Sequence, residues 1–267
     1  MDMDEAYENR AFIPNGDSYP PRWEEEARAW REMEHAVGRA RLNIPYGEEE
    51  RQGFDLFFPA GRPRGLVVFY HGGYWRAFDR KSWSHFAAGP AARGWAVAIP
   101  SYTLVPRARI ARITREAAAA LAVAAEKIAG PVVLTGHSAG GHLAARMLCA
   151  DVPLPETVAA RLARCVPISP LADLRPLLNT RMNDTLRLDA AEAEGESPAL
   201  RHKARDVPVT VWVGAEERPA FLDQARWLAE AWPGAALRIA PGRHHFDVID
   251  ELRAPDSPLT EALLGGL

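Results

Sequence analysis

The chain has 267 residues, of which 48% are hydrophobic and 25% are charged, and its formal net charge is −3. This composition is typical of a globular protein with an ample core, and the small charge gives no broad attraction for nucleic acid or an anionic membrane. No apolar run approaches the roughly eighteen residues that a membrane span needs. We therefore expect one domain over residues 1–267 that acts on a small molecule, with neither nucleic acid nor membrane as partner; the sequence predicts no oligomeric state.

The start of the chain is acidic and lacks the basic start and apolar stretch of a secretory signal. Cys149 and Cys165 stand in apolar surroundings and belong to no CxxC or Cys/His cluster, which is typical of buried free thiols in a reducing compartment. We therefore expect a cytoplasmic protein. Because no HExxH motif, phosphate loop or dinucleotide fingerprint occurs, we expect neither a metal nor a cofactor.

Residues 1–50 predict an N-terminal arm and a surface helix. The arm, 7–19, is expected to be extended, and residues 23–39 carry apolar side chains at helical spacing after the breaker Pro20-Pro21. Residues 52–58 then alternate polar and apolar side chains, which predicts a half-buried strand.

Strands and helices alternate along the rest of the chain. Leu66–Tyr70 is a continuous apolar run, typical of a central parallel strand covered on both faces. The rhythm predicts the α/β class, with a mostly parallel, doubly wound sheet, helices on both faces and ligands at the carboxyl ends of the strands. The further expected strands are 96–99, 132–135, 165–168, 209–213 and 236–240, and the expected helices are 81–93, 114–128 and 143–149.

Residues 171–205 interrupt this rhythm. They are rich in charged residues and leucine and contain prolines. We expect a helical, cap-like insertion over the site, with a plain surface excursion as the alternative, because long insertions in α/β folds are often functional.

The expected strand at 132–135 runs into a GxSxG sequence in which Ser138 is the central residue. Such a sequence predicts a nucleophile elbow, a strained strand-to-helix turn that pushes the serine hydroxyl into a cleft. Gly140 and Gly141 would let the new helix pack closely beneath the serine. Ser138 is therefore the expected nucleophile of an acyl-transfer reaction.

Acyl transfer by a serine needs a base and an acid that orients it, and in this fold they follow the serine in the order acid, histidine. The loop after the last expected strand contains His245, which we expect to be the base, with His244 as the alternative. The loop after the preceding strand contains Glu217, which we expect to orient the base. Glu216 beside it and Asp173 are the alternatives.

His71 and a glycine pair directly follow the strand Leu66–Tyr70. Two glycines let backbone amides approach a substrate carbonyl, as in the HGG oxyanion motifs of esterases. We expect the amides of Gly72, Gly73 and Ala139 to form the oxyanion hole.

Aromatic residues near the expected cleft suit a flat acyl or leaving group. Tyr74 and Trp75 are the first candidates for its wall, with core packing as the alternative, and Trp83 and Tyr102 are further ones. A cluster of arginines is expected to be a solvated face, with binding of an anionic substrate as the alternative; it comprises Arg107, Arg109 and Arg112.

The HGG loop, the GHSAGG elbow and the late HHF sequence together resemble the α/β hydrolase superfamily over about residues 54–252. In its arylformamidase (kynurenine formamidase) and esterase branch the acid stands two residues before a proline that precedes a helix, which maps onto Glu217 ahead of Pro219, although the family often has Asp there. The features that resemble this branch are Tyr7-Glu8-Asn9-Arg10, Tyr74-Trp75, Ser169-Pro170 with Asn183-Asp184, and His245-Phe246-Asp247.

The motifs and the resemblance lead to one expected function. We expect a cofactor-independent serine hydrolase that cleaves a small carboxylic ester or an arylformamide through an acyl-enzyme. A dedicated N-formylkynurenine formamidase is a narrower alternative. A catalytically silent α/β binding module is the alternative from another class.

Overall fold

The computed structural model describes residues 2–267 and contains an eight-stranded sheet in the order β1-β2-β4-β3-β5-β6-β7-β8. The strand β2 runs antiparallel to both β1 and β4, and the neighbours from β4 to β8 are parallel. The predicted α/β class with a mostly parallel sheet is confirmed. The strands are β1 (Ala40–Pro45), β2 (Gly53–Phe57), β3 (Leu66–Tyr70), β4 (Ala96–Pro100), β5 (Val132–His137), β6 (Leu162–Ile168), β7 (Thr210–Gly214) and β8 (Ala236–Ala240).

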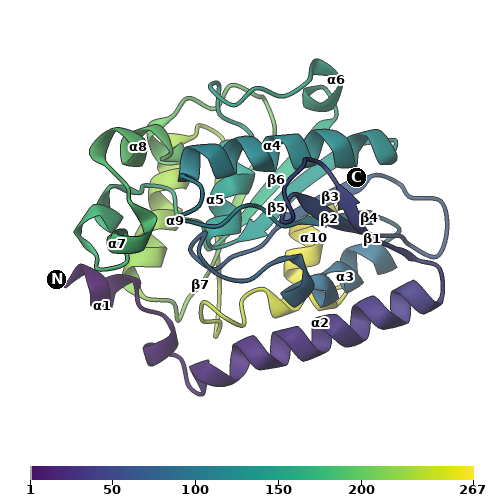
Figure 1. Cartoon of the computed structure of the whole chain (residues 1–267), viewed down its shortest axis with the longest axis horizontal. Coiled ribbons are helices and arrows are strands. Elements are labelled where there is room, and N and C mark those ends of the chain that lie inside the picture. Colours follow the sequence, from purple (N-terminus) through teal and green to yellow (C-terminus); the bar gives the residue numbers. More distant parts are fainter. Residues whose placement is uncertain (1) are drawn as a thin grey trace.

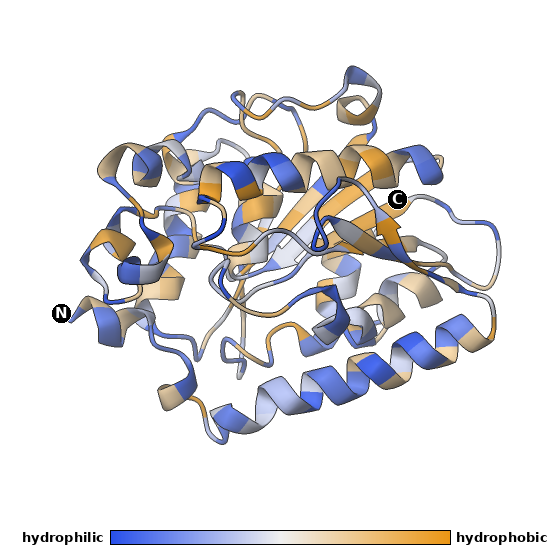
Figure 2. Ribbon diagram, viewed as in Figure 1, coloured by the Kyte–Doolittle hydropathy of each residue, from blue (hydrophilic) through white to orange (hydrophobic). Residues whose placement is uncertain are grey.

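Helices cover both faces of the sheet, as Figure 1 shows. Side chains of β3 alternate between the two faces: Leu66 and Val68 belong to one hydrophobic cluster, and Val67 and Phe69 belong to the other. The sheet is therefore the apolar middle layer of the molecule, and polar residues gather on the outer helices (Figure 2). One face carries α4 (Ile110–Lys127), α5 (Ala139–Arg146) and α9 (Pro219–Ala231), and the other carries α2 (Tyr19–Ala36), α3 (Ala88–Ala92) and α10 (Pro258–Leu264).

The insertion 171–205 is helical, as predicted. It contains α7 (Asn183–Leu186) and α8 (Ala190–Gly195), with 3₁₀ turns before and after them. A further short helix, α6 (Glu156–Ala159), lies before β6. No helix within residues 2–267 is long and apolar enough to cross a bilayer. Cys149 and Cys165 are free and buried, as expected.

The residues before β4 differ from the predicted secondary structure in four ways. The arm is not extended: α1 (Met3–Tyr7) ends at its first residue, and two 3₁₀ turns, Arg10–Phe12 and Gly16–Ser18, follow. Helix α2 begins at Tyr19, so Pro20 and Pro21 lie in its first turn, where no intrahelical amide bond is lost. Strand β1 was not predicted, and residues 81–93 form 3₁₀ turns followed by the short α3 instead of one helix.

A buried carboxylate explains why β2 is fully buried although its sequence alternates. The side chain of Asp55 is fully buried, and its oxygens accept hydrogen bonds from Arg31 Nε at 2.8 Å, Arg80 Nε at 3.2 Å and the Asn43 amide at 2.8 Å. These partners lie on α2, on a 3₁₀ turn and on β1. One paired charge therefore joins the N-terminal helix to the edge of the sheet.

We predict that Asp55→Ala destabilises the protein by about 3–5 kcal/mol, because it leaves buried guanidinium groups without their counter-charge. The measurement is the free energy of unfolding from urea titration followed by circular dichroism. The control is Glu32→Ala, which removes a carboxylate bound to Arg28 on the exposed side of the same helix and should change stability little. Equal, small losses for both variants would contradict the assignment.

Candidate active site

Ser138 stands on the strained turn that the GxSxG sequence predicts. Strand β5 ends at His137 and helix α5 begins at Ala139, and Ser138 between them has φ 56° and ψ −117°. A positive φ in a residue with a Cβ costs of order 1–3 kcal/mol and needs support from its surroundings. That support includes a hydrogen bond from the Ser138 amide to the Ile168 carbonyl at 2.8 Å.

The chain crosses itself too closely at the elbow for any side chain. A Cβ on Gly140 would lie 1.9 Å from the Tyr70 carbonyl oxygen, and one on Gly136 would lie 2.4 Å from the Gly140 oxygen. Glycine is therefore required at both positions. The first turn of α5 thus packs directly against the end of β3, just before His71 and the glycine pair.

The structure brings Glu217 to His245. The Nδ1 atom of His245 lies 2.6 Å from Glu217 Oε2, and both side chains are buried. The other oxygen, Oε1, accepts the Ser169 hydroxyl at 2.5 Å and the Gly214 amide at 2.8 Å. A carboxylate with both oxygens bound is fixed in place and holds the imidazole with its Nε2 free for another partner.

The alternative acids and the alternative base lie elsewhere. Glu216 is exposed, and Asp173 forms an ion pair with Arg175 at 2.6 Å. The Nε2 atom of His244 is 3.1 Å from the Tyr19 hydroxyl, and its Nδ1 is 3.2 Å from Asp247. His244 therefore ties the late loop to α2 and does not pair with Glu217.

Two further residues hold His245, and the sequence did not point to them. His137 Nε2 lies 2.8 Å from the His245 carbonyl oxygen, and burial keeps the pKa of His137 well below its usual value, so a neutral ring donates this bond. The ring of Phe221 lies with its centroid 4.2 Å from that of His245. His137 stands inside the GxSxG sequence, which is a signal for its position, whereas nothing in the sequence marks Phe221.

The predicted oxyanion residues have free amides beside the serine. The N–H groups of Gly72, Gly73 and Ala139 donate to no acceptor within residues 2–267. Gly73 has φ 109°, and a Cβ on Gly72 would lie 3.4 Å from the Ser138 Cβ. Unused backbone donors next to a nucleophile are what the stabilisation of a developing oxyanion requires.

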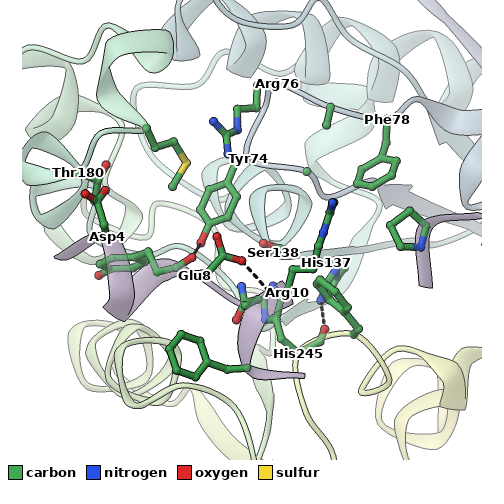
Figure 3. Close-up of a pocket in the computed structure, with 18 of the residues that line it drawn as sticks. Asp4, Glu8, Arg10, Tyr74, Arg76, Phe78, His137, Ser138, Thr180 and His245 are labelled. Atoms are coloured by element: carbon green, nitrogen blue, oxygen red, sulfur yellow. Dashed lines mark hydrogen bonds between the residues drawn. The ribbon is translucent and has the colours of Figure 1, made fainter. Parts of the chain in front are cut away.

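A cavity of about 710 Å³ opens above Ser138 and His245 (Figure 3). We call it the Ser138 cavity. Residues 2–12 provide one wall of it, which the sequence did not predict, and residues 180–182 of the insertion provide another. The remaining lining residues are Pro20, Trp23, Gly73, Tyr74, Arg76, Ala77, Phe78, Trp83, His137 and Phe246.

The aromatic candidates divide between the cavity and the core. Tyr74 borders the cavity, and its hydroxyl donates to the Tyr7 carbonyl at 2.7 Å. The expectation for Trp75 is wrong: it is fully buried and contacts His142 edge to face, so the core alternative holds. Trp83 borders the cavity, whereas Tyr102 is buried.

The arginine cluster is a surface feature outside the Ser138 cavity. Arg109 pairs with Asp189 at 2.7 Å and Glu192 at 2.6 Å, joining α4 to the insertion. Arg112 pairs with Glu116 at 2.9 Å, and Arg107 lies 3.8 Å from a carboxylate of Glu49. The cluster therefore forms solvent-exposed ion pairs and does not line the cavity. Within residues 2–267 no group of three or more His, Cys, Asp or Glu side chains is placed to hold a metal ion.

Curated relatives resemble the chain over most of its length. A kynurenine formamidase of Danio rerio is 28% identical over 249 residues, which cover 87% of this chain and 84% of the relative. A kynurenine formamidase of Drosophila melanogaster is 28% identical over 260 residues and covers 87% of this chain and 83% of the relative.

Solved structures share the fold. A provisionally named thioesterase of Silicibacter sp. TM1040 superposes with a TM-score of 0.95 at 54% identity, over 98% of this chain and 99% of that one. Esterase B of Lactobacillus rhamnosis superposes with a TM-score of 0.66 at 20% identity, over 91% and 90% of the two chains.

A family model described as the alpha/beta hydrolase fold matches residues 67–232, which include the glycine pair, the elbow and Glu217. The match covers more than half of the chain. The chain therefore belongs to the α/β hydrolase fold family and is a hydrolase.

Proposed function

We propose that the protein is a serine hydrolase that cleaves small carboxylic esters or arylformamides through an acyl-enzyme, without a cofactor. Ser138 is the nucleophile, His245 the base, and Glu217 the acid that orients it. The amides of Gly72, Gly73 and Ala139 hold the oxyanion. The observation that carries the proposal is the 2.6 Å contact between His245 Nδ1 and Glu217, made beside a serine on a strained turn in the same cavity.

Each step follows from these positions. Ser138 Oγ attacks the substrate carbonyl while His245 Nε2 takes its proton, and the charge on the carbonyl oxygen is held by the free amides. His245 then gives the proton to the departing alcohol or amine, which leaves the acyl group on Ser138. Water, activated by His245, releases the acid in the same way. Glu217 stays bonded to Nδ1 and stabilises the imidazolium that forms twice.

A flat aromatic substrate is supported by the walls of the Ser138 cavity. Tyr74, Phe78, Trp83 and Phe246 all line this cavity. Such surfaces bind planar groups with little loss of conformational freedom. Together with relatives named kynurenine formamidase, they support a second candidate, a dedicated N-formylkynurenine formamidase.

We predict that Ser138→Ala lowers kcat for p-nitrophenyl acetate by at least about 10³-fold, because the variant cannot form the acyl-enzyme. Stopped-flow absorbance measures the turnover, and a fluorophosphonate probe should label the wild type and not the variant. Ser18→Ala, on an exposed turn, is the matched control and should behave as the wild type. Undiminished turnover by Ser138→Ala refutes the nucleophile, and an unlabelled, inactive wild type indicates a binding module.

Replacing the two neighbouring glutamates separately tests the acid. Glu217→Gln should lower kcat by about three to four orders of magnitude, because the amide cannot stabilise the imidazolium and holds the wrong tautomer. Glu216→Gln should change kcat by less than about twofold, because its side chain is exposed. Steady-state kinetics at saturating substrate compares them. Equal losses, or a larger loss for Glu216→Gln, would rule out Glu217.

A substrate panel separates the general hydrolase from the dedicated formamidase. We expect kcat/KM for N-formylkynurenine to equal or exceed that for short p-nitrophenyl esters if the aromatic walls select the substrate, since they bind the aryl group in both ground and transition states. Acetyl thioesters complete the panel. A kcat/KM that is higher for the simple esters by orders of magnitude would rule out the dedicated formamidase and would remain consistent with the general hydrolase.

A further inference from the structure

One carboxamide side chain in the wall of the Ser138 cavity has an oxygen without a partner. Asn9 is 6% exposed and borders the cavity, and its Oδ1 makes no hydrogen bond within residues 2–267. Its Oδ1 is completely enclosed. An enclosed amide oxygen that stays unpaired costs about 1–3 kcal/mol and calls for an explanation.

The segment that carries Asn9 is fixed on both sides. The Tyr7 carbonyl accepts the Tyr74 hydroxyl at 2.7 Å, and the Tyr7 hydroxyl accepts a bond from the buried Gln224 at 2.8 Å. On the other side, Glu8 Oε1 caps the Arg10 amide at 2.8 Å, and the Phe12 amide donates to the Asn9 carbonyl at 3.0 Å. The position of Asn9 is therefore preorganised.

This anchoring ties Asn9 to the catalytic groups. Tyr74 directly follows the glycine pair, and Phe221 packs against both Tyr7 and His245, with ring centroids 5.9 Å and 4.2 Å away. Glu8 and Arg10, which flank Asn9 in the chain, lie in the same view of the cavity as Ser138 and His245 (Figure 3). The hydrogen bonds of Tyr7 to Tyr74 and Gln224 therefore fix the position of the wall that contains Asn9 relative to the oxyanion amides.

We propose that Asn9 determines substrate specificity by hydrogen bonding a neutral polar group, such as a carboxamide, amine or ketone, on the aryl part of the substrate. A carboxamide offers both a donor and an acceptor, and a half-turn exchanges them. A site built to bond such a group discriminates against analogues that lack it, because its own polar atoms would stay unpaired. This proposal rests on the proposed function. It concerns the part of the substrate that does not contact Ser138, His245 or the oxyanion amides.

The test uses aryl acetates that carry an acetamido group at ring position 2, 3 or 4, each beside the propyl analogue of similar size. The measured quantity is the ratio of kcat/KM for the polar ester to that for its propyl partner. In Asn9→Leu this ratio should fall by about tenfold or more at one ring position, corresponding to the loss of one well-placed hydrogen bond. Asn179→Leu, an exposed residue of the insertion, is the matched control and should keep the wild-type ratio.

A second variant guards against misfolding of the first. Asn9→Asp has the same shape and keeps the hydrogen-bond acceptors but loses the donors. Its kcat/KM ratio should therefore fall more for acetyl-substituted esters, whose substituent only accepts hydrogen bonds, than for acetamido esters, whose substituent also donates one. Ratios that stay at the wild-type value in both variants, with or without a lower melting temperature, overturn the role of Asn9 while the wild type remains a hydrolase. A wild type that hydrolyses no ester and takes no fluorophosphonate overturns the proposed function as well.

Discussion

The close crossing of the chain at the elbow is the constraint on which the rest of the site depends. Gly140 packs against the Tyr70 carbonyl at a distance that no Cβ permits, and the Ser138 amide is bonded to the Ile168 carbonyl. Strands β3, β5 and β6 are thereby locked together at their carboxyl ends, and Ser138 has no freedom to relax from its positive φ. The cost of this strain is offset by the parallel sheet on both sides, which is almost fully buried.

The cavity above the serine is assembled from parts that are distant in sequence. Gln224, fully buried on α9, donates to the Tyr7 hydroxyl and to the Asp173 carbonyl, and it accepts the amides of Ala172 and Asp173. One amide side chain therefore joins the N-terminal wall to the start of the insertion and to the helix that follows Glu217. This explains how an N-terminal segment with little core of its own takes a defined position beside the site.

Much of the sheet and of the elbow could be predicted from local sequence. Continuous apolar runs identify β3 and β5, and the glycines around Ser138 identify the turn, because each feature depends on residues close in the chain. Strand β1 was missed although its side chains alternate, because the stretch is short and ends in proline. The choice of Glu217 over Glu216 depended on the resemblance, since two adjacent carboxylates in a loop differ only in the direction of their side chains.

The errors at the cavity have a common physical cause. Tyr74 and Trp75 are neighbours with positive φ, 49° and 55°, and the local backbone sends one side chain to the cavity and the other into the core. The wall formed by residues 2–12 depends on contacts such as Tyr74 to Tyr7, 67 residues apart. Neither periodicity nor composition encodes such contacts. Lining residues are therefore harder to predict than the groups that perform the chemistry.

The central claim is that Ser138 carries the acyl group during turnover. Rapid mixing with an excess of an aryl acetate, acid quenching within the first turnover and peptide mass spectrometry would test it directly. Our account predicts one acetyl group on the peptide that contains Ser138, and more of it in Glu217→Gln if hydrolysis of the acyl-enzyme slows more than its formation. Efficient turnover with no acetylated Ser138 at any quench time, or with the acetyl group on another residue, would contradict it.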